Sequence, residues 1–153
     1  MIILGIDPGT TRIGFGLIKS ERGNLECLKY GLLSQSSPAG VMQEIGQITK
    51  DHKPDLAAVE KLFFFKNQKT IISVSEMRGV IMAALAINNI PVKEFTPLQV
   101  KQAVSGYGRA GKEQVEHMVR LILGIKGKIK PDDAADGLAI AICCANNIVY
   151  PTE

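Results

Sequence analysis

Two short apolar segments of the chain each end in a carboxylate, and this pattern constrains the fold more than any other feature. The first, Ile2–Asp7, ends at an aspartate directly before Pro-Gly-Thr, and the second, Leu56–Val59, is followed by Glu60. Sheets of α/β proteins place their sites at the carboxyl ends of strands. If a helix connects the two segments, their strands can lie parallel and about 4.8 Å apart. Both carboxylates would then share one edge of the sheet.

The remaining segments predict an α/β fold. Strand-like patterns occur at 2–7, 13–19, 25–33, 56–59 and 92–95, and helical spacing occurs at 39–50, 70–88, 97–104, 113–123 and 132–147. An antiparallel meander followed by strands that alternate with helices predicts a mixed sheet with helices packed on it. Because the 153 residues contain no repeat or linker, we expect one domain, 1–153.

Charge and composition narrow the class of protein. The net charge is +3, but residues 61–130 carry 12 Lys and Arg against 4 Asp and Glu, whereas the rest carries 6 against 11. A basic middle with acidic ends suits a polyanionic partner and a metal site, although a solvated surface would also explain it. No apolar run approaches the roughly 20 residues of a membrane span, and no signal-peptide pattern is present. The three cysteines have neither the spacing of a disulfide framework nor that of a metal site. Together these features predict a soluble, cytoplasmic protein.

A third acidic group begins the segment 132–147. Asp133 and Asp136 lie three residues apart and Asp132 and Asp136 four apart, so either pair can share one helix face. Acids in the first helical turn also complement the helix dipole, and we expect Asp132 to act as a cap. Asp136 lies one turn further in, which favours a site. Hard oxygen ligands of this kind suit Mg²⁺ or Mn²⁺.

Five stretches, in order, carry a family resemblance: ILGIDPGTTRIGFGLI, AVEKLFFFKN, MRGV, VKQAVSGYGRAGKEQVEHMV and DAADGLAIAI. At this spacing they resemble the RuvC-type Holliday junction resolvases, over nearly the whole chain. The resemblance implies an RNase H-like fold with a mixed five-stranded sheet flanked by helices. It matches Asp7, Glu60, Asp133 and Asp136 to the family's four acids, and it alone selects Asp133 over Asp132.

The resemblance also implies a chemistry that suits these residues. Four carboxylates can hold two divalent ions about 3.5–4 Å apart, one activating water and the other stabilising the leaving 3′ oxygen. The expected enzyme is a crossover junction endodeoxyribonuclease of DNA recombination and repair, with two Mg²⁺ per active site and Mn²⁺ as a substitute. It would make paired symmetric nicks with 5′-phosphate and 3′-hydroxyl ends. A pseudo-two-fold junction suits a homodimer, and the family adds RuvA and RuvB as partners.

Two basic or aromatic stretches complete the predicted site. GYGRAGK, residues 106–112, lacks the context of a nucleotide loop and is predicted to let Arg109 and Lys112 approach a phosphodiester. By resemblance Lys101 and Lys112 offset charge on the scissile phosphate. Three consecutive phenylalanines precede Lys66. The family resemblance implies that Phe63 inserts as a wedge between base pairs, a role that Phe64 could share. Lys66 and Arg78 are further predicted DNA contacts, although Arg78 and Gly79 could instead serve close packing.

Two other classes remain as alternatives. GIDPGTTRIGFGLI also resembles the first phosphate loop of actin-like ATPases and sugar kinases. Those proteins need two such domains around the nucleotide, and this length supplies one. A non-catalytic junction-binding protein is the second alternative, and the four acids count against it. Among nucleases, a ribonuclease H or YqgF-like protein would keep some acids without the Phe63 region, Lys101 and Lys112.

Overall fold

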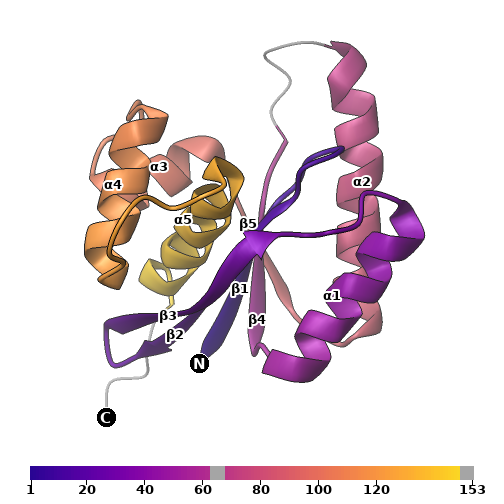
Figure 1. The fold of residues 1–153 in the computed structure, drawn as a ribbon, viewed down its shortest axis with the longest axis horizontal. Helices are drawn as coiled ribbons and strands as arrows, with labels where there is room; N and C mark the ends of the chain where they lie inside the picture. Colours follow the sequence, from indigo (N-terminus) through magenta and orange to yellow (C-terminus); the bar gives the residue numbers. More distant parts are fainter. Residues whose placement is uncertain (63–67, 149–153) are drawn as a thin grey trace.

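The computed structural model of the chain describes residues 1–62 and 68–148 (Figure 1). The strands in these ranges are β1 (Ile2–Asp7), β2 (Gly14–Glu21), β3 (Asn24–Leu32), β4 (Leu56–Glu60) and β5 (Val92–Phe95). The helices are α1 (Pro38–His52), α2 (Gln68–Ile87), α3 (Pro97–Ser105), α4 (Lys112–Leu123) and α5 (Asp132–Asn146). Each predicted element is present, and its ends differ by at most two residues from those expected.

The sheet has the mixed topology that the sequence predicts. Its strand order is β3-β2-β1-β4-β5. β1 and β2, and β2 and β3, pair antiparallel, whereas β4 pairs parallel with both β1 and β5. The last pair between β1 and β4 matches Ile6 with Val59, so Asp7 and Glu60 each come directly after the end of this parallel pairing. The two strand-ending carboxylates therefore share one edge of the sheet.

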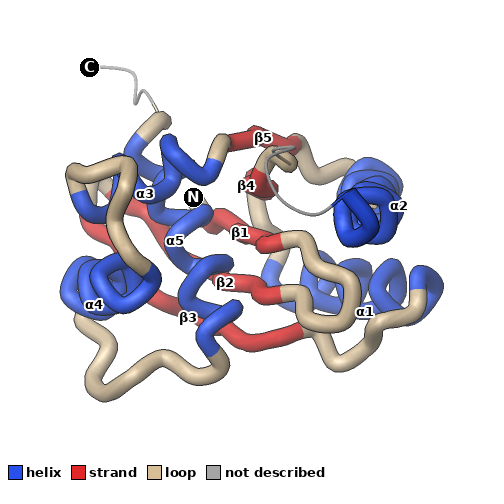
Figure 2. Tube along the Cα trace, turned by 90° about the horizontal axis from the view of Figure 1, so that it is seen from above, coloured by secondary structure: helices blue, strands red, loops and turns tan. Residues whose placement is uncertain are grey.

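Helices cover both faces of the sheet, so its central strands are apolar on both sides (Figure 2). Ile3 of β1 belongs to the buried cluster that includes residues of α3, α4 and α5. Leu4 and Ile6 belong to the other cluster, which includes residues of α1 and α2. Since side chains alternate along β1, Asp7 lies on the same face as Ile3, the face that α5 covers.

Glycines allow α5 to lie directly on β1 and β2. A Cβ added to Gly5 would stand 2.1 Å from the carbonyl oxygen of Gly137, and one added to Gly14 would stand 1.8 Å from the carbonyl oxygen of Asp133. No real Cβ atom tolerates such distances, so a larger residue at either position would push the helix away from the sheet. The close approach at Gly14 brings the first turn of α5 to the end of β1.

Local capping explains where two of the helices begin. The Thr96 hydroxyl accepts a hydrogen bond from the Gln99 backbone N–H at 3.1 Å, and the Gln99 side chain accepts one from the Thr96 N–H at 2.8 Å. This capping box starts α3, and Ser37 caps α1 in a similar way. Both α1 and α3 have proline in the first turn, where the backbone N–H has no partner within the helix and its absence loses no hydrogen bond. The start of α3 is thus fixed, and α3 carries Lys101 toward the sheet edge.

The helix α2 is more apolar than the sequence reading expected. Its segment Lys69–Ile87 is long and apolar enough to cross a membrane by length and composition alone, and 22% of an 18-residue stretch within it is buried in the protein. The prediction missed this because Glu76 and Arg78 interrupt the apolar run. Met77, Ile81, Ala84 and Leu85 enter the core, as in an ordinary packed helix, whereas Ile72 and Ile87 are exposed.

Candidate active site

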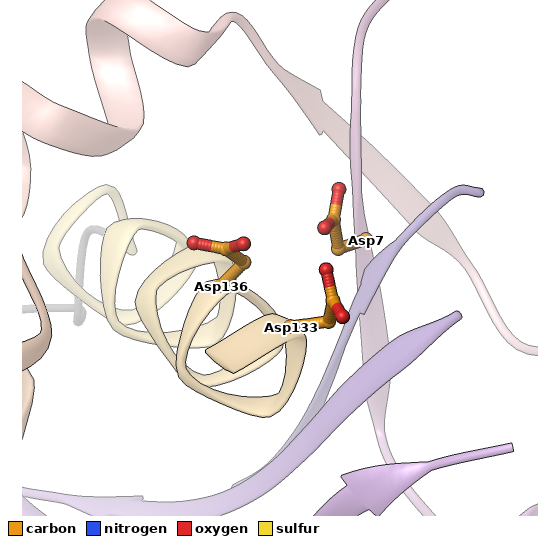
Figure 3. A group of neighbouring side chains, drawn as sticks. All are labelled: Asp7, Asp133 and Asp136. Atoms are coloured by element: carbon orange, nitrogen blue, oxygen red, sulfur yellow. The ribbon is translucent and has the colours of Figure 1, made fainter. Parts of the chain in front are cut away.

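Three aspartates meet where β1 ends and α5 begins (Figure 3). Asp7 is the last residue of β1, and Asp133 and Asp136 lie in the first two turns of α5. One carboxylate oxygen of each residue lies within 4.8 Å of those of the other two. Within residues 1–62 and 68–148, no other set of three or more His, Cys, Asp or Glu side chains comes this close. The structure therefore gathers three of the four predicted acids.

Glu60 joins this cluster from the neighbouring strand. It ends β4 and alternates with Ala58 and Leu56, which belong to the same buried cluster as α5. Glu60 lines one cleft with Asp7 and Asp136, although its carboxylate lies outside the 4.8 Å group. The fourth predicted acid thus faces the same space from one side.

Two lysines line the cleft opposite the acids. Lys101 comes from α3 and Lys112 from the first residue of α4. The Lys112 ammonium lies 3.7 Å from a carboxylate oxygen of Asp136, and its side chain is 77% exposed. The cleft therefore combines carboxylates from β1, β4 and α5 with cations from α3 and α4.

The pKa values of three acids in the cleft are raised, first by burial and then by the neighbouring carboxylates. Burial raises the pKa of Asp7 well above its usual value, and the carboxylates of Glu60, Asp136 and Asp133 raise it further. Burial and the Asp136 carboxylate raise the pKa of Glu60 to about 7, against the opposing effect of Lys101 and Lys112. Burial also raises the pKa of Asp136. Carboxyl groups that repel one another in this way are candidates for functional residues.

Arg12 neutralises one member of the cluster, and the sequence reading did not single it out. Its Nε lies 2.8 Å from a carboxylate oxygen of Asp133. Arg12 follows the Pro-Gly-Thr-Thr turn after Asp7, so its place in the same loop as the first acid was a signal that could have identified it. The loop conformation, which no periodicity predicts, decides where its side chain points.

Asp132 takes no part in the cluster, and the prediction that it caps α5 is wrong. The capping residue is Pro131, and the helix has no side-chain cap hydrogen bond. Asp132 is the first helical residue and is exposed. Its negative charge near the helix N-terminus still complements the dipole. Asp133, the residue that the family resemblance selects, is the one that approaches Asp7.

The other predicted site residues fall in three places. Arg78 is engaged inside the protein, because its Nε donates a hydrogen bond to the Glu60 carbonyl at 3.2 Å and its Nη2 pairs with Glu94. Arg109 is exposed in the α3–α4 loop and lines a neighbouring hollow with Tyr107. The predicted contacts Phe63, Phe64 and Lys66 lie outside the described residues. Gly79 is exposed, and a Cβ there would contact nothing within 4 Å.

The donor set fits a hard divalent cation. Every candidate ligand is a carboxylate, and oxygen-only sets of this kind suit Mg²⁺ or Mn²⁺ rather than zinc. The raised pKa values of Asp7, Glu60 and Asp136 indicate that a cation held among them would be stabilised by all three. Asp7, Asp133 and Asp136 are close enough to share one ion.

Comparisons with known proteins agree on one family. The family model described as "Crossover junction endodeoxyribonuclease RuvC" matches residues 3–144. A protein of that name from Syntrophomonas wolfei is 47% identical over 150 residues, covering 94% of this chain and 87% of its own length. Another from Moorella thermoacetica is 46% identical over 155 residues, covering 95% and 92%.

A solved structure shows the same arrangement of elements. The RuvC protein of T. thermophilus, solved in complex with a Holliday junction substrate, matches with a TM-score of 0.86 and 32% identity, over 94% of this chain and 92% of that one. The yeast mitochondrial Holliday junction resolvase Ydc2 matches with a TM-score of 0.65 at 13% identity, over 94% and 78%. This second likeness concerns the fold alone, which is RNase H-like in both cases, as predicted.

Proposed function

The chain belongs to the RuvC family of crossover junction endodeoxyribonucleases, and we propose from this that it resolves Holliday junctions by paired symmetric nicks in DNA recombination and repair. The observation that carries the proposal is the acidic cleft. Asp7, Glu60 and Asp136 line it together with Lys101 and Lys112, a set that can hold divalent metal and offset charge on a phosphodiester. Hydrolysis would leave 5′-phosphate and 3′-hydroxyl ends.

Asp7, Glu60, Asp133 and Asp136 are the residues that would hold the metal. Two Mg²⁺ ions per active site, or Mn²⁺ in their place, would activate a water molecule and stabilise the leaving 3′ oxygen. Asp7 stands between the β4 carboxylate on one side and the α5 carboxylates on the other, so it is the residue suited to serve both ions.

The chain's own cations act on the substrate. Lys101 and Lys112 face the cleft from α3 and α4, where each can offset negative charge on the scissile phosphate as it builds up in the transition state. Arg109, exposed in the loop that leads to Lys112, is proposed to contact another phosphate of the DNA. Phe63, with Phe64 as a second candidate, is proposed to wedge between base pairs at the junction centre, and Lys66 to contact the backbone there.

The active form is proposed to be a homodimer, because a four-way junction has two equivalent strands to cut. The exposed apolar side of α2 supports this assembly. Ile72 is 66% exposed and Ile87 68% exposed, and burying such side chains between two copies of the helix would stabilise a dimer. RuvA and RuvB, the family's branch-migration proteins, are proposed as further partners in the cytoplasm.

Cleavage of a synthetic four-way junction tests the proposal directly. The junction and a linear duplex of the same sequence are each incubated with the protein in Mg²⁺, in Mn²⁺ and in EDTA. We expect symmetric nicks in the junction alone, only with metal. Tight junction binding without nicks would instead support the non-catalytic alternative. No preference for the junction would contradict the proposal and make ATP the next ligand to test.

A further inference from the structure

The loop between α4 and α5, residues 124–131, carries three exposed lysines at alternate positions. We call it the lysine loop. Lys126, Lys128 and Lys130 are exposed, whereas Ile129 between two of them is fully buried. Gly127 has a φ of 81°, a left-handed conformation that glycine adopts without strain. The loop thus points its apolar side chain inward and presents three ammonium groups to solvent.

Contacts to α4 hold the lysine loop in place. The Ile129 backbone N–H donates a hydrogen bond to the Glu116 carboxylate at 2.9 Å. Arg120 Nε lies 3.1 Å from the same carboxylate oxygen, and the Glu116 side chain is only 13% exposed. Glu116 is therefore occupied within the protein and does not neutralise the lysines. A loop anchored at its centre can bind a ligand at a lower entropic cost than a free one.

The lysine loop lies beside the active cleft. Lys128 lines a small hollow together with Lys112 and Asp136, which also line the cleft. The loop leads directly into α5, whose first turns carry the clustered aspartates (Figure 2). Glu113, Glu116 and Asp132 also line this hollow, so an anion would be held by the exposed ammonium groups of the lysine loop on its solvent side rather than inside the hollow.

We propose that Lys126, Lys128 and Lys130 bind the phosphate backbone of the DNA arm that continues beyond the scissile phosphate. This inference rests on the proposed function. The loop bends at Gly127, so the three lysines do not form a straight row, but their long, flexible stems can each reach a different phosphate of a passing strand. Duplex DNA carries a charge every ~1.7 Å along its axis. A strand held at Lys112 therefore presents further phosphates to the lysine loop. Such contacts position DNA without reading its sequence.

The salt dependence of binding tests this site. The wild-type protein and a variant with Lys126→Gln, Lys128→Gln and Lys130→Gln are titrated against a labelled four-way junction in EDTA, at several NaCl concentrations. Each phosphate contact adds about 0.9 to the slope of log K against log salt. We expect the slope of the variant to be smaller by about 2 to 3, and its affinity at about 50 mM NaCl to fall on the order of 10-fold or more.

A matched variant separates a local site from a change in net charge. Lys29→Gln, Lys50→Gln and Lys53→Gln remove three exposed lysines that lie outside the lysine loop, and we expect this variant to keep the wild-type slope. An unchanged slope in the lysine-loop variant, or an equal reduction in both variants, would overturn the inference. If the triple variant does not fold, Lys128→Gln alone should lower the slope by about 1.

The same measurements distinguish this inference from the proposed function. A wild-type protein that neither binds nor cuts the junction would contradict the proposed function. A wild-type protein that binds and cuts, beside a lysine-loop variant with the same salt slope, would contradict only the lysine-loop site.

Discussion

The Arg12 guanidinium lies 2.8 Å from the Asp133 carboxylate, so one of the three clustered aspartates is paired with a cation of the protein itself. A metal ion and a guanidinium would use the same carboxylate oxygens. Arg12 would therefore compete with a divalent ion for Asp133, and its 58% exposed side chain leaves it room to move away if an ion binds there. A displaced Arg12 would place its charge where it could meet a DNA phosphate.

Replacing Arg12 with glutamine is expected to tighten metal binding. Exposed ion pairs contribute about 0.2–1 kcal/mol, so the dissociation constant for Mn²⁺ should fall by about 1.5- to 5-fold. Titration calorimetry of the DNA-free protein measures this without any cleavage. Arg22→Gln, an exposed arginine of the β2–β3 turn, is the control that should leave the constant unchanged. Weaker binding in the Arg12 variant would mean that Arg12 orients Asp133 for the metal.

Glu60→Gln is expected to stabilise the metal-free protein at high pH. The pKa of Glu60 is raised from 4.5 to about 7, so between these values the folded protein binds more protons than the unfolded chain. The free energy of unfolding therefore falls as pH rises through this range. Glutamine does not titrate, so the variant does not lose this part of the free energy of unfolding. It should melt about 5 °C higher than wild type at pH 8 in EDTA, with no difference at pH 4.

Exposed Glu26 of β3 supplies the control for this pH effect. Glu26→Gln should melt like the wild type at both pH values. Saturating Mg²⁺ should also remove most of the advantage of Glu60→Gln at pH 8, because the ion stabilises the ionised carboxylates. An advantage of equal size at pH 4 and pH 8 would mean that the glutamine improves packing rather than relieving charge repulsion.

Asp7→Asn is expected to abolish cutting while the junction still binds as tightly or more tightly. The substitution preserves shape but removes the carboxylate suited to serve both ions, so cleavage should fall on the order of 10³-fold or more. Asp132→Asn is the matched control, since Asp132 is acidic, exposed and next to Asp133 but outside the cluster. Gel assays of nicking and of binding, run side by side, check both. Loss of binding together with cutting in Asp7→Asn would argue against a purely catalytic role.

The sequence predicted the sheet and one edge of the site because both follow from local patterns. Strand alternation places Asp7 and Glu60 on one face, and a helical crossover makes their strands parallel, so no knowledge of side-chain packing was needed. The choice between Asp132 and Asp133 could not be made in this way. It depends on how α5 is rotated over the sheet, which the close contact of Gly14 with the Asp133 carbonyl fixes. The Arg12 contact depends on a loop that has no periodic pattern.

Phe63→Ala is expected to slow junction resolution without changing affinity for linear duplex. Inserting an aromatic ring between base pairs costs a few kcal/mol of unstacking, which only a distorted junction centre can offset, so the ring should matter little on a regular duplex. Single-turnover cleavage of the junction measures the effect, with duplex affinity from anisotropy as its reference. An unchanged rate in Phe63→Ala beside a slower Phe64→Ala would assign the wedge to Phe64.

Ile72→Asp is expected to weaken the proposed dimer and to uncouple the two nicks. Ile72 lies on the exposed side of α2 at 66% exposure, so a charge there would have to be buried between two copies of the helix at a cost of several kcal/mol. Analytical ultracentrifugation should show monomers, and supercoiled cruciform DNA should accumulate as nicked circles rather than linear product. Leu121→Asp, at 62% exposure on α4, adds the same charge elsewhere and should leave the dimer intact. A stable Ile72→Asp dimer would place the interface away from this side of α2.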